Sequence, residues 1–366
     1  MSPVMLTIEK LEIPFKQAFA HATAIRSCTE SILVKAESSN GVIGVGEGCP
    51  RSYVTGETIQ TASDFFDSHR EAWEQFKCLE DLKVWMASNS QRIDMNPASW
   101  CAVELALLDH WGQSQGQSIE AFLNLEEVTG QFHYSAVLGT ENVATFEKQA
   151  QQFSALEFCD FKVKVTGNFE NDRQKIEFLK KRPIKNLRVR LDANNLWKTP
   201  AEAVTYLKRF QYPFMAIEEP LPVGDYEGCR QISQQLGLPI ILDESFLRME
   251  QVHQLQNDPQ SWILNIRISK MGGILRSLAI AEEAKSRGIP IIIGAQVGET
   301  SILTRAALTV ANHYRDILLA QEGAFGTYLL KQDVTDSPLM FGKRGMLDSQ
   351  ALSGQPGLGL PLAQPA

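Results

Sequence analysis

Strand-like and helix-like segments alternate along most of this chain, and no other feature constrains its fold as strongly. Short apolar runs are separated by longer stretches in which apolar residues recur at helical spacing, as in 169–181, 273–287 and 300–313. Eight such strands with helices between them close more naturally into a barrel than they remain an open sheet. The predicted strands are 132–137, 159–165, 187–191, 214–217, 239–242, 262–268, 290–293 and 317–320.

An open, doubly wound sheet is the alternative, but no strand is followed by the G-x-G-x-x-G phosphate fingerprint of that fold. The first part of the chain has a different pattern. Residues 31–37 and 42–47 flank a Ser-Ser-Asn-Gly turn and predict an antiparallel hairpin. A helix is expected to begin near Pro97 and to end at Gly112 or Gly116. We therefore expect an α+β module in residues 1–125, a barrel in 126–330, and a Gly- and Pro-rich segment, 331–366, that packs back on the module.

Five charged residues recur at a nearly constant interval through the barrel region. They are Lys164, Asp192, Glu218, Asp243 and Lys270, separated by 28, 26, 25 and 27 positions. That interval matches one strand, one helix and the return, so each residue is expected at the end of a successive strand. The carboxyl ends of barrel strands form one rim, where such barrels carry their chemistry.

Asp192, Glu218 and Asp243 would then converge in one pocket. A single acidic residue at a strand end is usually solvated or caps the next helix, but three on successive strands point to a shared ligand. Hard carboxylate oxygens suit Mg²⁺, which keeps positions open for a substrate anion and acts as a Lewis acid.

The lysines complete the predicted chemistry. Lys162 and Lys164 have the same parity, so both face the barrel interior, and we expect repulsion, burial and a nearby cation to lower their pKa values. Lys270 lies about half a circumference away from Lys164. Two opposed amines beside a metal-held carboxylate suit removal of its α-proton, with Lys162 adding charge beside the enediolate. Return of a proton to the far face gives racemisation, whereas a leaving group or internal nucleophile gives elimination or cycloisomerisation.

Composition excludes several other classes of function. The net charge of −8 and a pI near 5.4 argue against a nucleic-acid partner. No apolar run approaches the roughly 18 to 20 residues of a membrane span, and the start lacks the pattern of a signal peptide. The six cysteines form no C-x-x-C pair, which favours reduced thiols and a cytoplasmic location.

Together these motifs resemble the enolase superfamily, in its muconate lactonizing enzyme subgroup. The residues that carry the resemblance are Lys162-Val163-Lys164, Leu191-Asp192-Ala193-Asn194, Ile217-Glu218-Glu219-Pro220, Leu242-Asp243-Glu244-Ser245 and Ser269-Lys270-Met271-Gly272-Gly273. The resemblance implies a capping α+β domain on a modified (β/α)₇β barrel. It also implies one Mg²⁺ ion, with Mn²⁺ as an alternative, bound by Asp192, Glu218 and Asp243.

The same resemblance assigns further roles. Lys164 and Lys270 would be the acid/base pair, and Lys162 would contact the substrate carboxylate. Asn194 and Glu244 would support the metal shell, and Asn194 would also contact the substrate. Cap and rim loops would bind the rest of the substrate, although His21, Arg26 and Arg51 also fit structural roles and Gln296 and Glu299 also fit helix capping. The residues implied for these loops are Phe19, His21, Arg26, Arg51, Tyr53, Gln296 and Glu299.

Two sequence patterns bear on which activities of this superfamily the chain can have. No histidine stands at the end of the sixth or seventh strand, which disfavours the mandelate racemase subgroup. Dipeptide epimerases carry an Asp-x-Asp pair after the eighth strand, but the nearest match here, residues 333–336, has a different spacing. We expect a racemase or epimerase of an amino acid derivative or dipeptide, or a cycloisomerase. One alternative is an o-succinylbenzoate synthase-like enzyme or another dehydratase that uses the same rim. The alternative from outside the enzymes is a barrel that binds a ligand without catalysis. The resemblance also implies a homo-oligomer.

Overall fold

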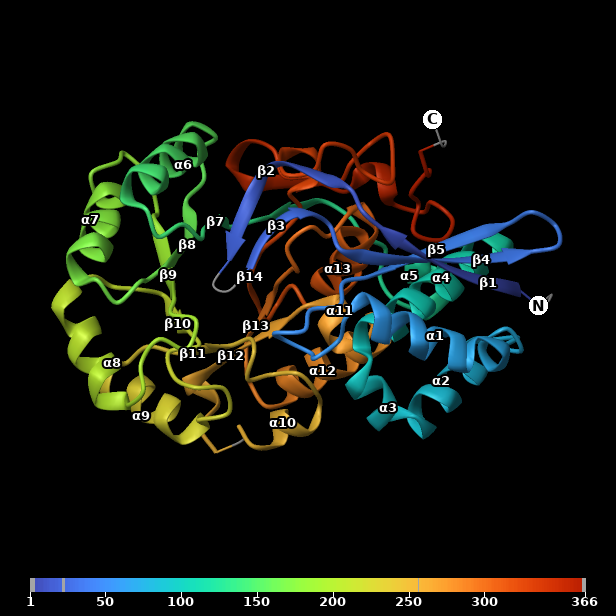
Figure 1. Ribbon diagram of the computed structural model, residues 1–366, viewed down its shortest axis with the longest axis horizontal. Helices are drawn as coiled ribbons and strands as arrows, with labels where there is room; N and C mark the ends of the chain where they lie inside the picture. The colour runs from blue at the N-terminus through green and yellow to red at the C-terminus, as the bar shows by residue number, and fades with distance from the viewer. Residues whose placement is uncertain (1–3, 22–23, 256, 364–366) are drawn as a thin grey trace.

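Eight parallel strands form one curved sheet in the computed structural model, which describes residues 4–21, 24–255 and 257–363 (Figure 1). The backbone N–H of Ser135, just before β7, donates a hydrogen bond to the carbonyl of Gln321 in β14 at 2.8 Å. This bond links the first and last strands of the sheet. In chain order, which is also their spatial order, the strands are β7 (Ala136–Leu138), β8 (Asp160–Lys164), β9 (Arg188–Asp192), β10 (Ala216–Glu218), β11 (Ile240–Leu242), β12 (Trp262–Ile266), β13 (Ile291–Ile293) and β14 (Leu318–Gln321).

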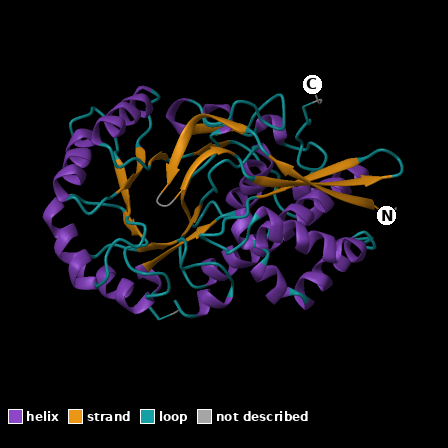
Figure 2. Cartoon of the chain, viewed as in Figure 1, coloured by secondary structure: helices purple, strands orange, loops and turns teal. Residues whose placement is uncertain are grey.

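Helices connect successive strands and lie outside the curved sheet (Figure 2). Each of the seven connections contains at least one helix, so the predicted (β/α)₇β arrangement is confirmed. The connecting helices are α6 (Val143–Ala155), α7 (Phe169–Lys180), α8 (Pro200–Leu207), α9 (Tyr226–Leu236), α10 (Glu250–His253), α11 (Ile268–Met271), α12 (Ile274–Ser286) and α13 (Ser301–His313).

The N-terminal part contains the predicted hairpin, which belongs to an antiparallel sheet of order β1-β4-β5. Helix α4 lies against β5 so closely that a Cβ atom at Gly46 would stand 2.0 Å from the carbonyl oxygen of Ala102. Only glycine fits there. The elements are β1 (Val4–Leu11), β2 (Pro14–His21), β3 (Ala24–Cys28), β4 (Ser31–Ser38), β5 (Ile43–Gly48), α1 (Ile59–Trp73), α2 (Leu79–Ser88), α3 (Ser90–Met95), α4 (Pro97–Gln115) and α5 (Ile119–Leu123).

The chain after β14 returns to both parts of the molecule. Strand β15 (Met346–Asp348) pairs with β6 (Gln131–His133), the short antiparallel strand that precedes the barrel. Further on, the N–H of Gly357 donates to Gln117 at 2.8 Å, and the N–H of Leu358 donates to Oδ1 of Asp109 at 2.7 Å. The C-terminal segment therefore contacts both the end of α4 and β6, the strand just before the barrel.

The structure differs from the sequence expectation at two places. The predicted strand 132–137 divides into β6 and β7, because Tyr134 hydrogen-bonds to Gly345 whereas Ser135 hydrogen-bonds to β14. Strand β12 ends at Ile266, and the residues predicted to extend it enter helix α11. Helix α4 continues through Gly112 and ends at the left-handed Gly116, one of the two glycines expected to end it.

The barrel interior is apolar on one side and charged on the other. Strands β10 to β14 contribute a separate buried cluster of Ala216, Ile241, Ile263, Ile292 and Ala320. Strands β8 and β9 contribute buried lysine, arginine and aspartate side chains instead. Because barrel interiors are usually filled with branched apolar residues, the charged side marks where function is to be sought.

Two findings bear on the predicted environment of the chain. All six cysteines are free thiols. Within the described residues, every helix is too short or too polar to span a bilayer.

Candidate active site

The predicted rim residues lie side by side at the carboxyl ends of adjacent strands. Lys164, Asp192 and Glu218 are the last residues of β8, β9 and β10, and the register pairs Lys164 with Asp192 and Asp192 with Glu218. Asp243 follows β11 directly, and all four side chains are buried. The sheet thus brings three carboxylates and an amine to one level.

Lys162 lies among these carboxylates. Its Nζ atom stands 2.8 Å from Oε1 of Glu218, 3.1 Å from Oε2 of Glu322 and 3.5 Å from Oδ2 of Asp192. Burial opposes the charged amine, but the three carboxylates outweigh burial and raise the pKa of Lys162 above its ordinary value. The carboxylates thus outweigh the repulsion and burial that were expected to lower the pKa of Lys162.

Lys270 differs in both position and electrostatics. It lies in the short helix α11, four residues beyond the end of β12, and not at the strand end expected from spacing. Its Nζ donates to Oδ1 and the backbone oxygen of Asp243, each at 2.8 Å, and to the carbonyl of Asn265 at 2.9 Å. Burial, reinforced by the charge of Arg267, lowers the pKa of Lys270 well below its ordinary value. A lysine whose pKa is lowered in this way is better suited to act as a base than one with the ordinary pKa.

The oxygen donors of the rim fit a hard divalent cation. Within the described residues, Oε2 of Glu218, Oε2 of Glu244 and Oδ1 of Asn194 are buried without a hydrogen-bond partner. Burial raises the pKa of Glu218 to about 7 and that of Glu244 to about 8, so a cation nearby would relieve an electrostatic cost.

The rim carboxylates are at present neutralised by side chains. Over the described residues, no three His, Cys, Asp or Glu side chains already stand at ligating distance from one point. Lys162 contacts Asp192 and Glu218, while Arg267 and Lys270 hold the two oxygens of Asp243. The donor set fits Mg²⁺, provided that these cationic side chains shift from the oxygens they now contact.

Two acidic residues that the sequence patterns did not single out also belong to the site. Glu322 follows β14 and bridges Lys162 and Arg190. Glu219 accepts the backbone N–H groups of Asp243 at 2.7 Å and Ser245 at 2.8 Å, which orients the loop after β11. Glu322 stands two residues beyond the predicted eighth strand, and that position was the available signal for it.

A rim cavity opens above these groups. It is lined by Lys162, Lys164, Asp192 and Glu322 and by residues of the surrounding loops, among them Tyr53 and Gln296. Gln296 accepts a hydrogen bond from Arg267 at 3.0 Å. Arg267, which the sequence patterns did not identify, lines the same cavity and connects Gln296 to Asp243.

The other residues predicted to bind substrate do not all line the rim cavity. Arg26 pairs with Glu30 at 2.8 Å and donates to the Tyr53 hydroxyl at 3.3 Å. Glu299 accepts the N–H of Gln296 at 2.6 Å and does not line the rim cavity. Phe19 and His21 lie in β2, but their side chains are outside the described part of the structure.

Arg51 and Asp333 have structural partners. The Arg51 guanidinium is buried and donates to the carbonyls of Thr29, Glu30, Pro50 and Val297, so its expected contact with substrate has no support. Asp333 accepts the N–H of Ser301 at the start of α13. Asp333 thus helps to cap α13, a role that the sequence patterns did not predict.

Comparison with known proteins agrees with the geometry. Residues 145–366 match the family model described as "Enolase C-terminal domain-like". The "Hydrophobic dipeptide epimerase" of Enterococcus faecalis is 26% identical over 86% of this chain and 88% of its own length. The "N-succinyl-L-Arg/Lys racemase" of Bacillus cereus is 25% identical over 82% of this chain and 81% of its own.

Solved structures confirm the fold. A substrate-liganded complex of the L-Ala-D/L-Glu epimerase from Bacillus subtilis superposes with a TM-score of 0.88 at 22% identity, covering all of both chains. The family model spans more than half of this chain and contains every rim residue described above. The protein is therefore an enzyme of the enolase superfamily, in the group of mandelate racemase and muconate lactonizing enzyme.

Proposed function

We propose that this protein is a Mg²⁺-dependent racemase or epimerase that inverts the carbon next to a substrate carboxylate, acting on an amino acid derivative or a dipeptide. The observation that carries the proposal is the shared register of Lys164, Asp192 and Glu218 at the rim. The activities for which the relatives are named, dipeptide epimerisation and N-succinyl amino acid racemisation, support this class of reaction.

In this proposal Asp192, Glu218 and Asp243 hold the metal ion, and Asn194 and Glu244 support that shell. Bound Mg²⁺ supplies a Lewis acid that withdraws charge from the substrate carboxylate. A solved dipeptide epimerase of Enterococcus faecalis "complexed with Mg and dipeptide L-Leu-L-Tyr", 24% identical to this chain, supports the choice of metal. Mn²⁺ has the same preference for oxygen ligands and is the alternative.

The lysines divide the remaining work. Lys162, held protonated by its carboxylate neighbours, binds and orients the substrate carboxylate. Lys270 has the lowered pKa of a base and removes or returns the α-proton from its side of the substrate. Lys164 lines the rim cavity and does the same from the opposite side. Removal on one face and return on the other inverts the carbon.

The residues above the rim set the choice of substrate. Tyr53, Gln296, Arg267 and Glu322 line the cavity and would contact the group attached to the α-carbon. The six free thiols agree with a cytoplasmic location, and a homo-oligomer is expected by analogy with the family.

Product analysis in D₂O tests the proposal. The enzyme with Mg²⁺ is incubated with a panel of dipeptides and N-acyl amino acids, and products are followed by NMR and chiral chromatography. We expect at least one substrate to lose stereochemical purity while gaining deuterium at the α-carbon. A new product without epimerisation would instead identify a cycloisomerase or dehydratase, and an inert panel with no Mg²⁺ binding in calorimetry would favour the non-catalytic barrel.

A further inference from the structure

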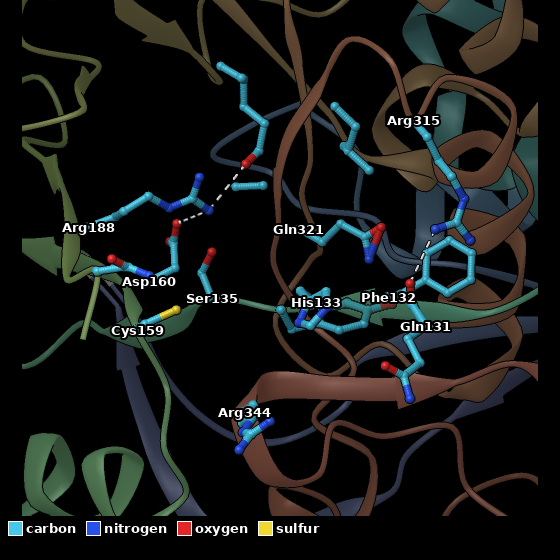
Figure 3. Close-up of a pocket in the computed structure, with 15 residues that line it drawn as sticks. Gln131, Phe132, His133, Ser135, Cys159, Asp160, Arg188, Arg315, Gln321 and Arg344 are labelled. Carbon is cyan, nitrogen blue, oxygen red and sulfur yellow. Dashed lines mark hydrogen bonds and ion pairs between the residues drawn. The ribbon is translucent and has the colours of Figure 1, made fainter. Parts of the chain in front are cut away.

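A second cavity lies at the opposite end of the barrel from the rim, and Figure 3 shows the residues that line it. It has a volume of about 490 Å³, against about 70 Å³ for the rim cavity, and lies within the range of small-molecule sites. Asp160, Arg188 and Leu318, the first residues of β8, β9 and β14, line it. This lower cavity is therefore at the amino ends of the strands.

The lower cavity is positively charged although the chain carries a net charge of −8. Three arginines line it, and Arg188 pairs at 2.6 Å with Asp160, which also lies 3.3 Å from the buried Arg190. Arg344 shares Glu157 with Lys343. Arg315 donates to the carbonyls of Thr129 and Gln131 and to Asn312, and among the described residues it has no carboxylate partner.

The inner wall of the lower cavity contains a buried side-chain amide, that of Gln321. Gln321 is 2% exposed, and its side-chain amide makes no hydrogen bond of good geometry within the described residues, although it lies beside the Tyr134 hydroxyl. A buried amide without a full partner is costly. A ligand oxygen that accepts a hydrogen bond from this amide would remove that cost.

Charged side chains connect the lower cavity to the rim through the barrel interior. Alternate residues of a strand share one face, so in β9 Arg188 faces the lower cavity, Arg190 the interior and Asp192 the rim cavity. Strand β8 repeats the pattern with Asp160 at the lower cavity and Lys162 at the rim cavity. Both ends of this side of the barrel are therefore polar.

Arg190 joins the two ends. Its Nη2 atom donates to Oγ of Ser135 at 2.7 Å and lies 3.3 Å from Oδ1 of Asp160, both in the wall of the lower cavity. Its Nη1 atom lies 3.1 Å from Oε1 of Glu322, whose other oxygen lies 3.1 Å from Lys162. The ion pairs run unbroken from Arg188 to Lys162.

We propose that the lower cavity is a binding site for a small anion with carboxylate or phosphate groups, and that its occupancy is coupled to the rim through Arg190. Guanidinium groups bind carboxylates and phosphates through bidentate hydrogen bonds. An anion at Arg188 competes with Asp160, which then pairs more fully with Arg190 and draws it from Glu322. The coupling is reciprocal, because a change at Glu322 must alter anion affinity by the same factor. The site does not depend on the proposed activity.

Calorimetry with the full-length chain tests the site, with inorganic phosphate and glutarate as separate probes. We expect at least one to bind with a Kd of about 1 mM or tighter. Arg188→Ala should weaken that binding at least about tenfold, and Gln321→Leu should weaken it severalfold. Arg173→Ala, which removes an arginine on α7 of the same 48% side-chain exposure as Arg188, is the matched control and should bind like the wild type.

Absence of binding for both probes would overturn the site, as would unchanged binding in Arg188→Ala, since the anion would then lie at the rim. The coupling has its own readout. Glu322→Gln releases Arg190 toward Asp160 and frees Arg188, so it should tighten anion binding severalfold. An unchanged Kd in Glu322→Gln would contradict the connection between the two cavities.

Discussion

Lys162 donates a hydrogen bond from Nζ to Oε1 of Glu218 at 2.8 Å. Both side chains lie inside the barrel, across from the apolar cluster of β10 to β14. Asp192 and Glu322 lie within 3.5 Å and 3.1 Å of the same amine. One lysine thus neutralises a cluster of buried carboxylates. This relationship makes the stability of the fold depend on the charges of the site.

Lys162→Met should destabilise the protein, because removal of one partner of a buried ion pair leaves the other uncompensated. We expect the free energy of unfolding to fall by about 3 kcal/mol in the presence of a chelator. Addition of Mg²⁺ should recover part of the loss, since the cation takes over the neutralisation. Denaturant unfolding with and without Mg²⁺ measures both effects.

Lys164→Met is the matched control from the same strand. Among the described residues, the one ion pair of Lys164 is with the exposed Glu141 at 3.5 Å, and we expect its loss to cost less than about 1 kcal/mol. Equal destabilisation by the two substitutions would contradict the special position of Lys162.

Glu218→Gln should weaken Mg²⁺ binding at least about tenfold, because it removes a charged donor whose second oxygen is buried and unpartnered. Calorimetric titration with Mg²⁺ measures the change. Glu141→Gln removes a solvent-exposed carboxylate beside Lys164, and it should bind Mg²⁺ like the wild type. Wild-type affinity in Glu218→Gln would remove Glu218 from the metal site.

Glu104 makes stability depend on pH. Its buried carboxyl accepts the N–H of Leu275 at the start of α12, and burial raises its pKa to about 8 from the ordinary 4.5. Between these values the unfolded chain ionises Glu104 while the folded protein keeps the proton, so stability falls as pH rises toward 8.

Glu104→Gln keeps an oxygen acceptor and cannot ionise. From about pH 5 to pH 8 the wild type should lose at least about 1 kcal/mol more stability than Glu104→Gln. Urea unfolding across this range gives both slopes. The exposed Glu202 at the start of α8 provides the control, since Glu202→Gln should keep the wild-type slope. Parallel slopes for Glu104→Gln and the wild type would mean that Glu104 is already ionised in the folded protein.

Spacing alone was enough to locate much of the site. Residues one strand-helix unit apart must return to the same end of a barrel, and Lys164, Asp192 and Glu218 do so in register. The parity of Lys162 and Lys164 likewise placed both amines inside. These inferences hold because strand alternation and barrel closure are properties of the backbone.

What the sequence could not supply depends on side chains that meet across long distances. Lys270 has the spacing of a strand end, but Arg267 begins a turn that places it in α11. The raised pKa of Lys162 results from Glu218, Glu322 and Asp192 together, and Glu322 lies 160 residues away in the chain. The split of 132–137 results from pairing with β15. No local pattern identifies β15 as the partner of β6, and the position of Glu322 just beyond the predicted eighth strand does not show that it meets Lys162.

Solvent exchange by single-lysine variants tests the central claim most directly. Each enantiomer of an accepted substrate is incubated in D₂O with Mg²⁺ and with Lys164→Ala, Lys270→Ala or the surface control Lys285→Ala, and α-carbon deuterium is read by NMR. We predict that Lys285→Ala labels both enantiomers, whereas Lys164→Ala and Lys270→Ala each label only one, and opposite ones. Labelling of both enantiomers by either active-site variant would contradict two amines acting on opposite faces.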